Sequence, residues 1–77
     1  MQLEVLSIKG VVVSCEVNSV ILPGLQGSFG VWPGHTPLVS VLKDGKLLYF
    51  NPDENELAIE GGYVKIQDDY ISVCLNG

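Results

Sequence analysis

A chain of 77 residues makes one small domain, residues 1–77, which buries only about 60 to 65% of its extended surface on folding. The formal net charge of −5, with only four Lys and Arg residues, argues against a nucleic-acid partner and against docking on anionic lipid. No apolar run approaches the ~20 residues that cross a bilayer and the N-terminus does not resemble a signal peptide, so we expect neither lipid insertion nor export.

Short segments in which apolar and polar residues alternate, separated by turn residues, predict an all-β chain without helices. The pattern is typical of a small antiparallel β-sandwich, here of about nine or ten short strands. In chain order the expected strands are Gln2–Ile8, Val11–Glu16, Ser19–Leu22, Gly27–Val31, Leu38–Lys43, Lys46–Phe50, Glu56–Glu60, Tyr63–Gln67 and Tyr70–Leu75.

The connectors between these strands carry specific turn chemistry. Three dipeptides supply the positive φ angles that tight hairpins require: Lys9-Gly10, Asp44-Gly45 and Gly61-Gly62. Two others suit the central positions of type II turns: Pro23-Gly24 and Pro33-Gly34. Asn51–Asn55 predicts a longer polar loop.

Residues two apart on a strand share one face of the sheet, so the alternation predicts which side chains face the core. The expected inward rows are Val11, Val13, Cys15 and Val17; Leu57 and Ile59; Val64 and Ile66; and Ile71, Val73 and Leu75. A second apolar set lies outside these rows: Val12, Ile21, Val39, Val41 and Leu48. Either this set meets a partner protein, or one strand turns the corner between two sheets. The composition, 47% hydrophobic and only 17% charged, favours a partner.

Nothing in the sequence predicts catalysis, a bound cofactor or a metal site. His35 is the only histidine, so no histidine cluster can hold a metal. Gly24, Gly27 and Gly30 are interpreted as turn residues, because no helix and no lysine follow them as in a phosphate-binding loop. The acidic side chains of the polar loop are interpreted as solvated, and not as cation ligands: Asp53, Glu54 and Glu56.

The two cysteines, Cys15 and Cys74, lie in expected strands and have no metal-ligand spacing. In a reducing compartment we expect them to be small apolar packing residues, and a disulfide is the alternative.

The most distinctive segment is Trp32–Pro37, in sequence WPGHTP. Pro33 and Pro37 fix φ at their own positions, and Pro37 also pushes Thr36 toward an extended conformation. A loop of this stiffness loses little entropy when it docks on a partner. Trp32 and His35 are the candidate anchors. The alternative for Trp32 is a place in the core, and the alternative for His35 is a structural hydrogen bond.

The segment Leu22–Leu38, in sequence LPGLQGSFGVWPGHTPL, resembles the signature of the epsilon subunit family of F-type ATP synthases. The family carries a glycine-spaced turn, an aliphatic and an aromatic residue, Pro-Gly-His, a small residue, Pro and Leu. The matching residues here are Val31, Trp32, Pro33, Gly34, His35, Thr36, Pro37 and Leu38. Gly61-Gly62 and the closing strand Ile71–Val73 are also similar to the family pattern, so the resemblance covers essentially the whole chain.

The resemblance implies a flattened β-sandwich at the foot of the central stalk, a non-catalytic rotor part that joins the gamma subunit to the membrane ring and supports rotary coupling. It implies a position on the cytoplasmic face of the bacterial inner membrane. The implied gamma-subunit contacts are Ser7, His35 and Ser40, to which the outer apolar residues Val39 and Val41 are added. The implied ring contacts are Ser28, Phe29 and Gly30, although relatives often carry a carboxylate where Ser28 stands.

Most relatives continue beyond the position of Gly77 into a two-helix domain that can inhibit ATP hydrolysis, so neither inhibition nor ATP binding is assigned to this chain. The alternative function is a biotinyl or lipoyl carrier domain, with Lys43-Asp44-Gly45-Lys46 as the hairpin tip that holds the modified lysine. That turn lacks the residues which usually flank such a lysine. An oligonucleotide-binding barrel is disfavoured by the net charge.

Overall fold

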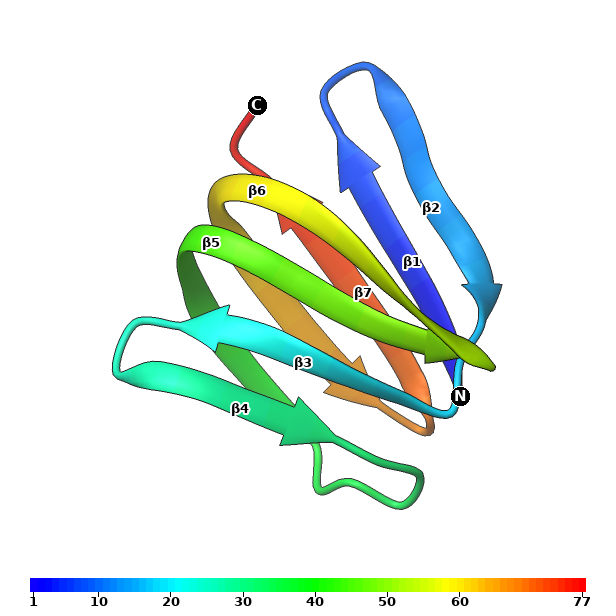
Figure 1. Ribbon diagram of the computed structural model, residues 1–77. Coiled ribbons are helices and arrows are strands. Elements are labelled where there is room, and N and C mark those ends of the chain that lie inside the picture. Colours follow the sequence, from blue (N-terminus) through cyan, green and yellow to red (C-terminus); the bar gives the residue numbers. More distant parts are fainter.

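The computed structural model describes residues 1–77 as seven strands and no helix, which confirms the prediction of an all-β sandwich domain. The strands are β1 (Gln2–Ser7), β2 (Gly10–Glu16), β3 (Ser19–Gly24), β4 (Gly27–Val31), β5 (Leu38–Asn51), β6 (Asp53–Gln67) and β7 (Tyr70–Leu75). They form one hydrogen-bonded sheet in the order β2-β1-β7-β6-β5-β3-β4 (Figure 1). Every neighbouring pair is antiparallel except β1 and β7, which run parallel.

The sheet folds over on itself because β5 and β6 are long and bent (Figure 1). The first part of β5, Leu38–Leu42, pairs with the end of β6 that also pairs with β7. The rest of β5 pairs with the start of β6 and with β3, which in turn pairs with β4. The two halves of the β5–β6 ribbon therefore lie in different layers, and one continuous sheet makes both faces of the sandwich.

Two of the predicted hairpin dipeptides are wrong, because Asp44-Gly45 and Gly61-Gly62 lie inside β5 and β6. Four expected strands consequently merge into two, which lowers the number of strands to seven. Gly61 and Gly62 do adopt positive φ angles, of 96° and 147°. The backbone freedom is used to bend a strand and not to reverse the chain. Position 62 also requires a residue without a side chain, since a Cβ there would collide with the carbonyl oxygen of Cys74 on β7.

Two further connectors also differ from expectation. Pro23-Gly24 ends β3, and the turn to β4 is Leu25-Gln26, followed by Gly27 at a φ of 126°. The expected loop Asn51–Asn55 is a tight reversal, in which only Pro52 separates β5 from β6. Cross-strand pairing that continues as far as Asn51 and Asp53 leaves no room for a longer loop.

Of the two remaining turn predictions, one is partly right and one is confirmed. The residues between β1 and β2 are Ile8-Lys9, and Gly10, the second residue of the expected dipeptide Lys9-Gly10, begins β2 with the expected positive φ, of 125°. Pro33-Gly34 forms the expected turn, because Gly34 has a φ of 83° and the amide of His35 donates to the carbonyl of Trp32 at 3.2 Å.

Thirteen apolar side chains form the core between the layers: Leu3, Val5, Val17, Val20, Leu22, Val31, Leu42, Leu47, Ile59, Val64, Ile66, Ile71 and Val73. The inward rows predicted on β6 and β7 are confirmed, with Leu57 and Leu75 partly buried at their ends. The row predicted on β2 is only partly right. Val13 and Cys15 pack against the core, but Val11 is 60% exposed. The reason is a bulge opposite Val5 and Leu6, which inserts one residue and turns Val11 outward.

Both cysteines are free and partly buried. Cys15 packs against the core, as expected for a small apolar side chain.

Candidate functional site

The loop Trp32–Pro37 runs from β4 in one layer to the start of β5 in the other. Trp32 is 59% exposed, so it is not a core residue. Its indole lies on the backbone of β4 at Gly30, where a Cβ would collide with the ring. Phe29, in contrast, is half-buried and packs against the core. The loop thus presents an aromatic side chain to solvent while resting on the sheet.

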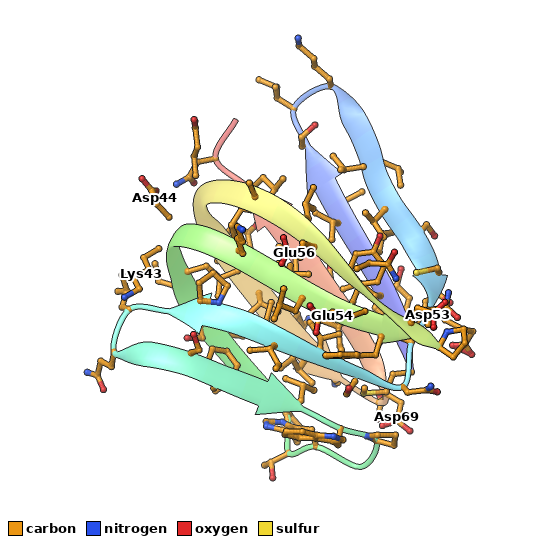
Figure 2. All side chains as sticks on the ribbon, in the orientation of Figure 1. Lys43, Asp44, Asp53, Glu54, Glu56 and Asp69 are labelled. Atoms are coloured by element: carbon orange, nitrogen blue, oxygen red, sulfur yellow. The ribbon has the colours of Figure 1, made fainter.

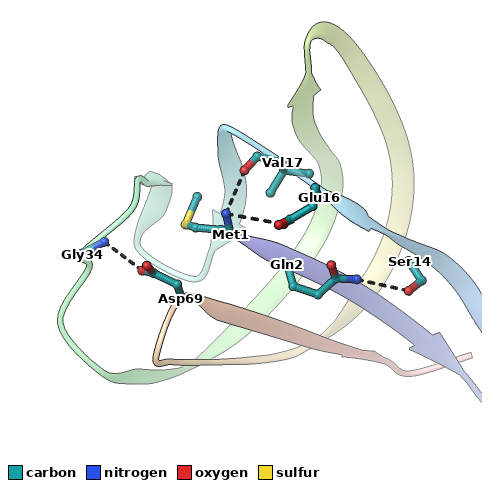
Figure 3. A network of polar contacts seen from close by, with 7 residues as sticks. All are labelled: Met1, Gln2, Ser14, Glu16, Val17, Gly34 and Asp69. Atoms are coloured by element: carbon teal, nitrogen blue, oxygen red, sulfur yellow. Dashed lines mark hydrogen bonds and ion pairs between the residues drawn. The ribbon is translucent and has the colours of Figure 1, made fainter.

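The backbone of the loop is held by hydrogen bonds as well as by its prolines, and Figure 3 shows the one from Gly34 to Asp69. The amide of Gly34 donates to Oδ1 of Asp69, in the turn between β6 and β7, at 2.9 Å. Nδ1 of His35 lies 2.6 Å from the carbonyl oxygen of Thr36. Because a carbonyl can only accept, the ring donates from Nδ1 in this contact.

A groove of about 550 Å³ opens between the β3–β4 hairpin and the start of β5, the strand that follows this loop. One wall is the turn and first residues of the β3–β4 hairpin, and the other is the start of β5. The lining residues are Gly24, Leu25, Gln26, Gly27, Ser28, Phe29, Val39, Ser40 and Val41. The structure therefore brings two of the expected ring contacts next to three of the expected gamma contacts.

The outer face of β5 carries an apolar patch, defined here as Val39, Val41 and Tyr63. Val39 is 68% exposed and Val41 is 55% exposed. Tyr63 on β6 is the cross-strand partner of Val41 and is 51% exposed. Hydrogen bonding to the side chain of Cys74 raises the pKa of the Tyr63 phenol above its usual value, so the patch is uncharged at neutral pH. Of the second apolar set, Val12 is also exposed, while Ile21 and Leu48 are half-buried.

Ser7 does not lie with the other expected gamma contacts. It ends β1 at the hairpin to β2, where its Oγ accepts from the amide of Lys9 at 3.2 Å. The other end of β1 is the one near the loop, because the amide of Gln2 donates to the carbonyl of Asp69 at 3.0 Å. Five residues of strand, roughly 17 Å, separate the two ends. A single partner that contacts both Ser7 and His35 would have to extend along the whole sandwich.

The segment considered as a carrier hairpin, Lys43 to Lys46, is not a hairpin tip. These residues lie within β5 at its bend, and Figure 2 shows Lys43 and Asp44 beside the curved ribbon. Nζ of Lys46 forms an ion pair with Oε2 of Glu56 at 3.3 Å. A protruding turn that could swing a modified lysine is therefore absent, which removes the structural basis of the carrier alternative.

The acidic residues at the start of β6 are spread along a strand and are not gathered in a loop (Figure 2). No group of three or more His, Cys, Asp or Glu side chains is placed to hold a metal ion. No helix long and apolar enough to cross a membrane is present either.

Three residues of the groove, the patch and the loop's surroundings were not singled out by the sequence: Leu25, Tyr63 and Asp69. Leu25 is an exposed leucine in the turn that lines the groove. Tyr63 could have been found, since its alternation with the inward residue Val64 places it on the outer face. Asp69 could not, because its role depends on a contact with Gly34, 35 positions away.

The family model of the beta-sandwich domain of the ATP synthase Delta/Epsilon chain matches residues 1–77. Among curated relatives, the ATP synthase epsilon chain of Campylobacter fetus is 42% identical over 77 residues, which are 97% of this chain and 60% of that protein. The epsilon chain of Sulfurovum sp. is 38% identical over 79 residues, covering 62% of its length. The chain thus spans about 60% of the length of these relatives.

Solved structures with the same fold include a chain of the Tetrahymena thermophila mitochondrial ATP synthase central stalk and c-ring. It superposes with a TM-score of 0.81 at 12% identity, over 97% of this chain and 62% of that one. A chain of the Euglena gracilis mitochondrial ATP synthase gives a TM-score of 0.87 at 20% identity, over 97% and 49%. At these identities the likeness establishes the fold.

Proposed function

We propose that this chain has the role of a central-stalk subunit, because it belongs to the family of the beta-sandwich domain of the ATP synthase Delta/Epsilon chain. The chain is a non-catalytic part of the central stalk, which joins the gamma subunit to the membrane ring and so helps to couple ion flow to ATP synthesis. As part of that complex it lies at the membrane without entering it, on the cytoplasmic face of the bacterial inner membrane.

The observation that carries this proposal is the exposed apolar surface formed by the groove and the apolar patch, on the strand into which the loop leads. Val39 and Val41 belong to both the groove and the patch, and the loop leads directly into their strand. Exposed valines on a strand with a stiff, aromatic loop beside it have a large desolvation gain and a small entropy cost on docking. A surface of this kind favours a long-lived protein contact over binding of a small ligand.

Within this surface, the two expected partners take different parts. The patch and His35 face the gamma subunit, and the hairpin residues Ser28, Phe29 and Gly30 face the ring. Because Ser28 is exposed and uncharged, its contact with the ring is a hydroxyl hydrogen bond and not a charge-assisted one.

The proposal is tested by binding to the purified gamma subunit. The wild-type chain should co-elute with it in gel filtration at low salt, whereas Val39→Ser combined with Val41→Ser should weaken the complex at least about tenfold, because two exposed methyl-bearing contacts are lost. Ala58→Ser, an exposed apolar position in the other half of β6, is the control and should bind as the wild type does. Failure of the wild-type chain to bind the gamma subunit, alone or within a rotor assembly, would overturn the proposal.

A further inference from the structure

We propose that Asp69 is a positioning residue, whose carboxylate holds the loop Trp32–Pro37 in the conformation that docks on the partner. This inference rests on the proposed function, because it supposes that the loop docks on a partner. Asp69 lies outside the docking surface and orders the loop before it docks. Asp69 itself lies in the turn between β6 and β7, on a different part of the chain from the loop.

The geometry of the turn aims the carboxylate at the loop. Asp68 and Asp69 both adopt left-handed φ angles, of 53° and 59°, which is the backbone of a two-residue type I′ hairpin. The carbonyl of Asp69 accepts a hydrogen bond from the amide of Gln2 at 3.0 Å, so the turn is anchored to β1. From this fixed base, Oδ1 of Asp69 accepts the amide hydrogen of Gly34 at 2.9 Å (Figure 3).

The loop has little else to hold its middle. Pro33 and Pro37 have no amide hydrogen to donate, and the contacts of His35 to Trp32 and Thr36 remain inside the loop. The bond from Gly34 to Asp69 is the only hydrogen bond that joins the loop to another element. It is a bond to a charged acceptor, which is stronger than one between neutral groups.

Without this bond, Gly34 would be the most flexible residue of the loop, because glycine has more backbone freedom than any other residue. The prolines stiffen the loop on both sides of Gly34, but they do not determine where the loop lies relative to the sandwich. The Trp32 indole on Gly30 places the start of the loop, and the Asp69 carboxylate places its middle. The conformational entropy of this middle part is therefore lost when the chain folds and not when the loop docks.

The turn offers a matched set of variants. Asp69→Gly removes the carboxylate and keeps a residue that accepts a left-handed φ, so the hairpin itself should survive. Asp68→Gly makes the same change one position earlier, where no hydrogen bond to the loop is present. Asp69→Asn retains an acceptor oxygen at the same place and should restore the function.

Two measurements test the proposal. In the free chain, hydrogen exchange of the Gly34 amide should be at least about tenfold faster in Asp69→Gly than in Asp68→Gly, because only the former loses the acceptor. Binding to the gamma subunit should be about three- to tenfold weaker in Asp69→Gly, and nearly unchanged in Asp68→Gly and Asp69→Asn.

The outcomes separate this inference from the function on which it rests. If Gly34 exchanges equally fast in both glycine variants, or if Asp69→Gly binds the gamma subunit as tightly as the wild type, the positioning role is wrong while the proposed function stands. If both glycine variants weaken binding equally, the effect belongs to the turn as a whole and the proposal fails. If the wild-type chain does not bind at all, the proposed function fails first, and the docking role with it.

Discussion

At the scale of single residues, this small domain leaves no buried polar side chain, so its polar groups act at the surface. Their hydrogen bonds join segments that are distant in sequence, such as Gly34 with Asp69 and Tyr70 with Glu4. Each bond is exposed and contributes little to stability by itself. Its importance lies in orienting a turn or a loop that the hydrophobic core does not reach.

Tyr70 provides a test of such a surface bond. Its hydroxyl donates to Oε1 of Glu4 at 3.0 Å, and this hydrogen bond raises the pKa of the Tyr70 phenol above its usual 10.0. A raised pKa in the folded state means that the bond stabilises the fold fully below pH 10.0, and that the contribution is lost as the pH rises through the raised value.

We therefore expect urea unfolding midpoints of the wild type to exceed those of Tyr70→Phe by a constant amount from pH 7 to 9. The difference should shrink above pH 10, where the phenol of the unfolded chain loses its proton while that of the folded chain still holds it. Glu4→Ala should behave as Tyr70→Phe does over the neutral range. A difference that stays constant to pH 11.5 would show that this pair does not couple stability to pH.

At the scale of elements, the two bent strands decide the architecture. The ladder between β5 and β6 pairs Leu42 with Gly62 and Asp44 with Glu60, and is interrupted between these two pairs. At this interruption Gly61 and Gly62 take φ angles that other residues rarely adopt. The bend moves the chain from one layer to the other without ending either strand, so it replaces two loops that the domain would otherwise need.

The bend predicts an unequal response to alanine at two glycines. Gly62→Ala should lower the free energy of unfolding by about 2 to 4 kcal/mol, because the new Cβ meets the Cys74 carbonyl and the left-handed backbone is strained. Gly45→Ala, at the bend of the partner strand, should cost at most about 1 kcal/mol. Its Cβ would lie 3.1 Å from the ring of Pro23, and Gly45 has no positive φ.

Urea unfolding followed by circular dichroism compares the two variants at one temperature. Equal losses would contradict the assignment of Gly62 as the residue on which the bend depends.

At the scale of the whole molecule, the parallel pairing of β1 with β7 joins the first and last strands of the fold. Val73 on β7 is fully buried and pairs with Val5 on one side and Val64 on the other. The core and the apolar patch consist of different side chains. The interior depends on strands from both ends of the chain, while the patch is carried by the β5–β6 ribbon.

One substitution made at two positions distinguishes these parts. Val73→Ala should lower the free energy of unfolding by about 1 to 3 kcal/mol, a large share of the roughly 4 to 12 kcal/mol expected for a domain of this size. Val41→Ala should change it by no more than about 0.5 kcal/mol, yet weaken binding to the gamma subunit. Unfolding curves and binding constants for both variants check this separation, which fails if Val41→Ala destabilises the fold as much as Val73→Ala.

Local signals in the sequence predicted the all-β class, the turns at Gly10 and Gly34, and the inward rows of β6 and β7. Each depends on alternation or on φ preference within a few residues. The same signals misplaced Gly61-Gly62, because a positive φ suits a hairpin turn and a strand bend equally well. They also misplaced Val11. The bulge there is set by the pairing of β2 with β1, and it is not visible in the alternation of residues along β2 itself.

For the candidate site, the sequence by itself determined the stiff loop and the outward valines, since proline geometry and alternation are local properties, and its residue order was sufficient to identify the family. Only the tertiary structure decided that Trp32 lies outside the core on Gly30, that Ser28 and Phe29 share a groove with Val39 and Val41, and that Asp69 holds Gly34. These features arise between segments brought together by the folding over of the sheet. The physical reason is that packing and hydrogen bonding act through space, whereas propensity and periodicity act along the chain.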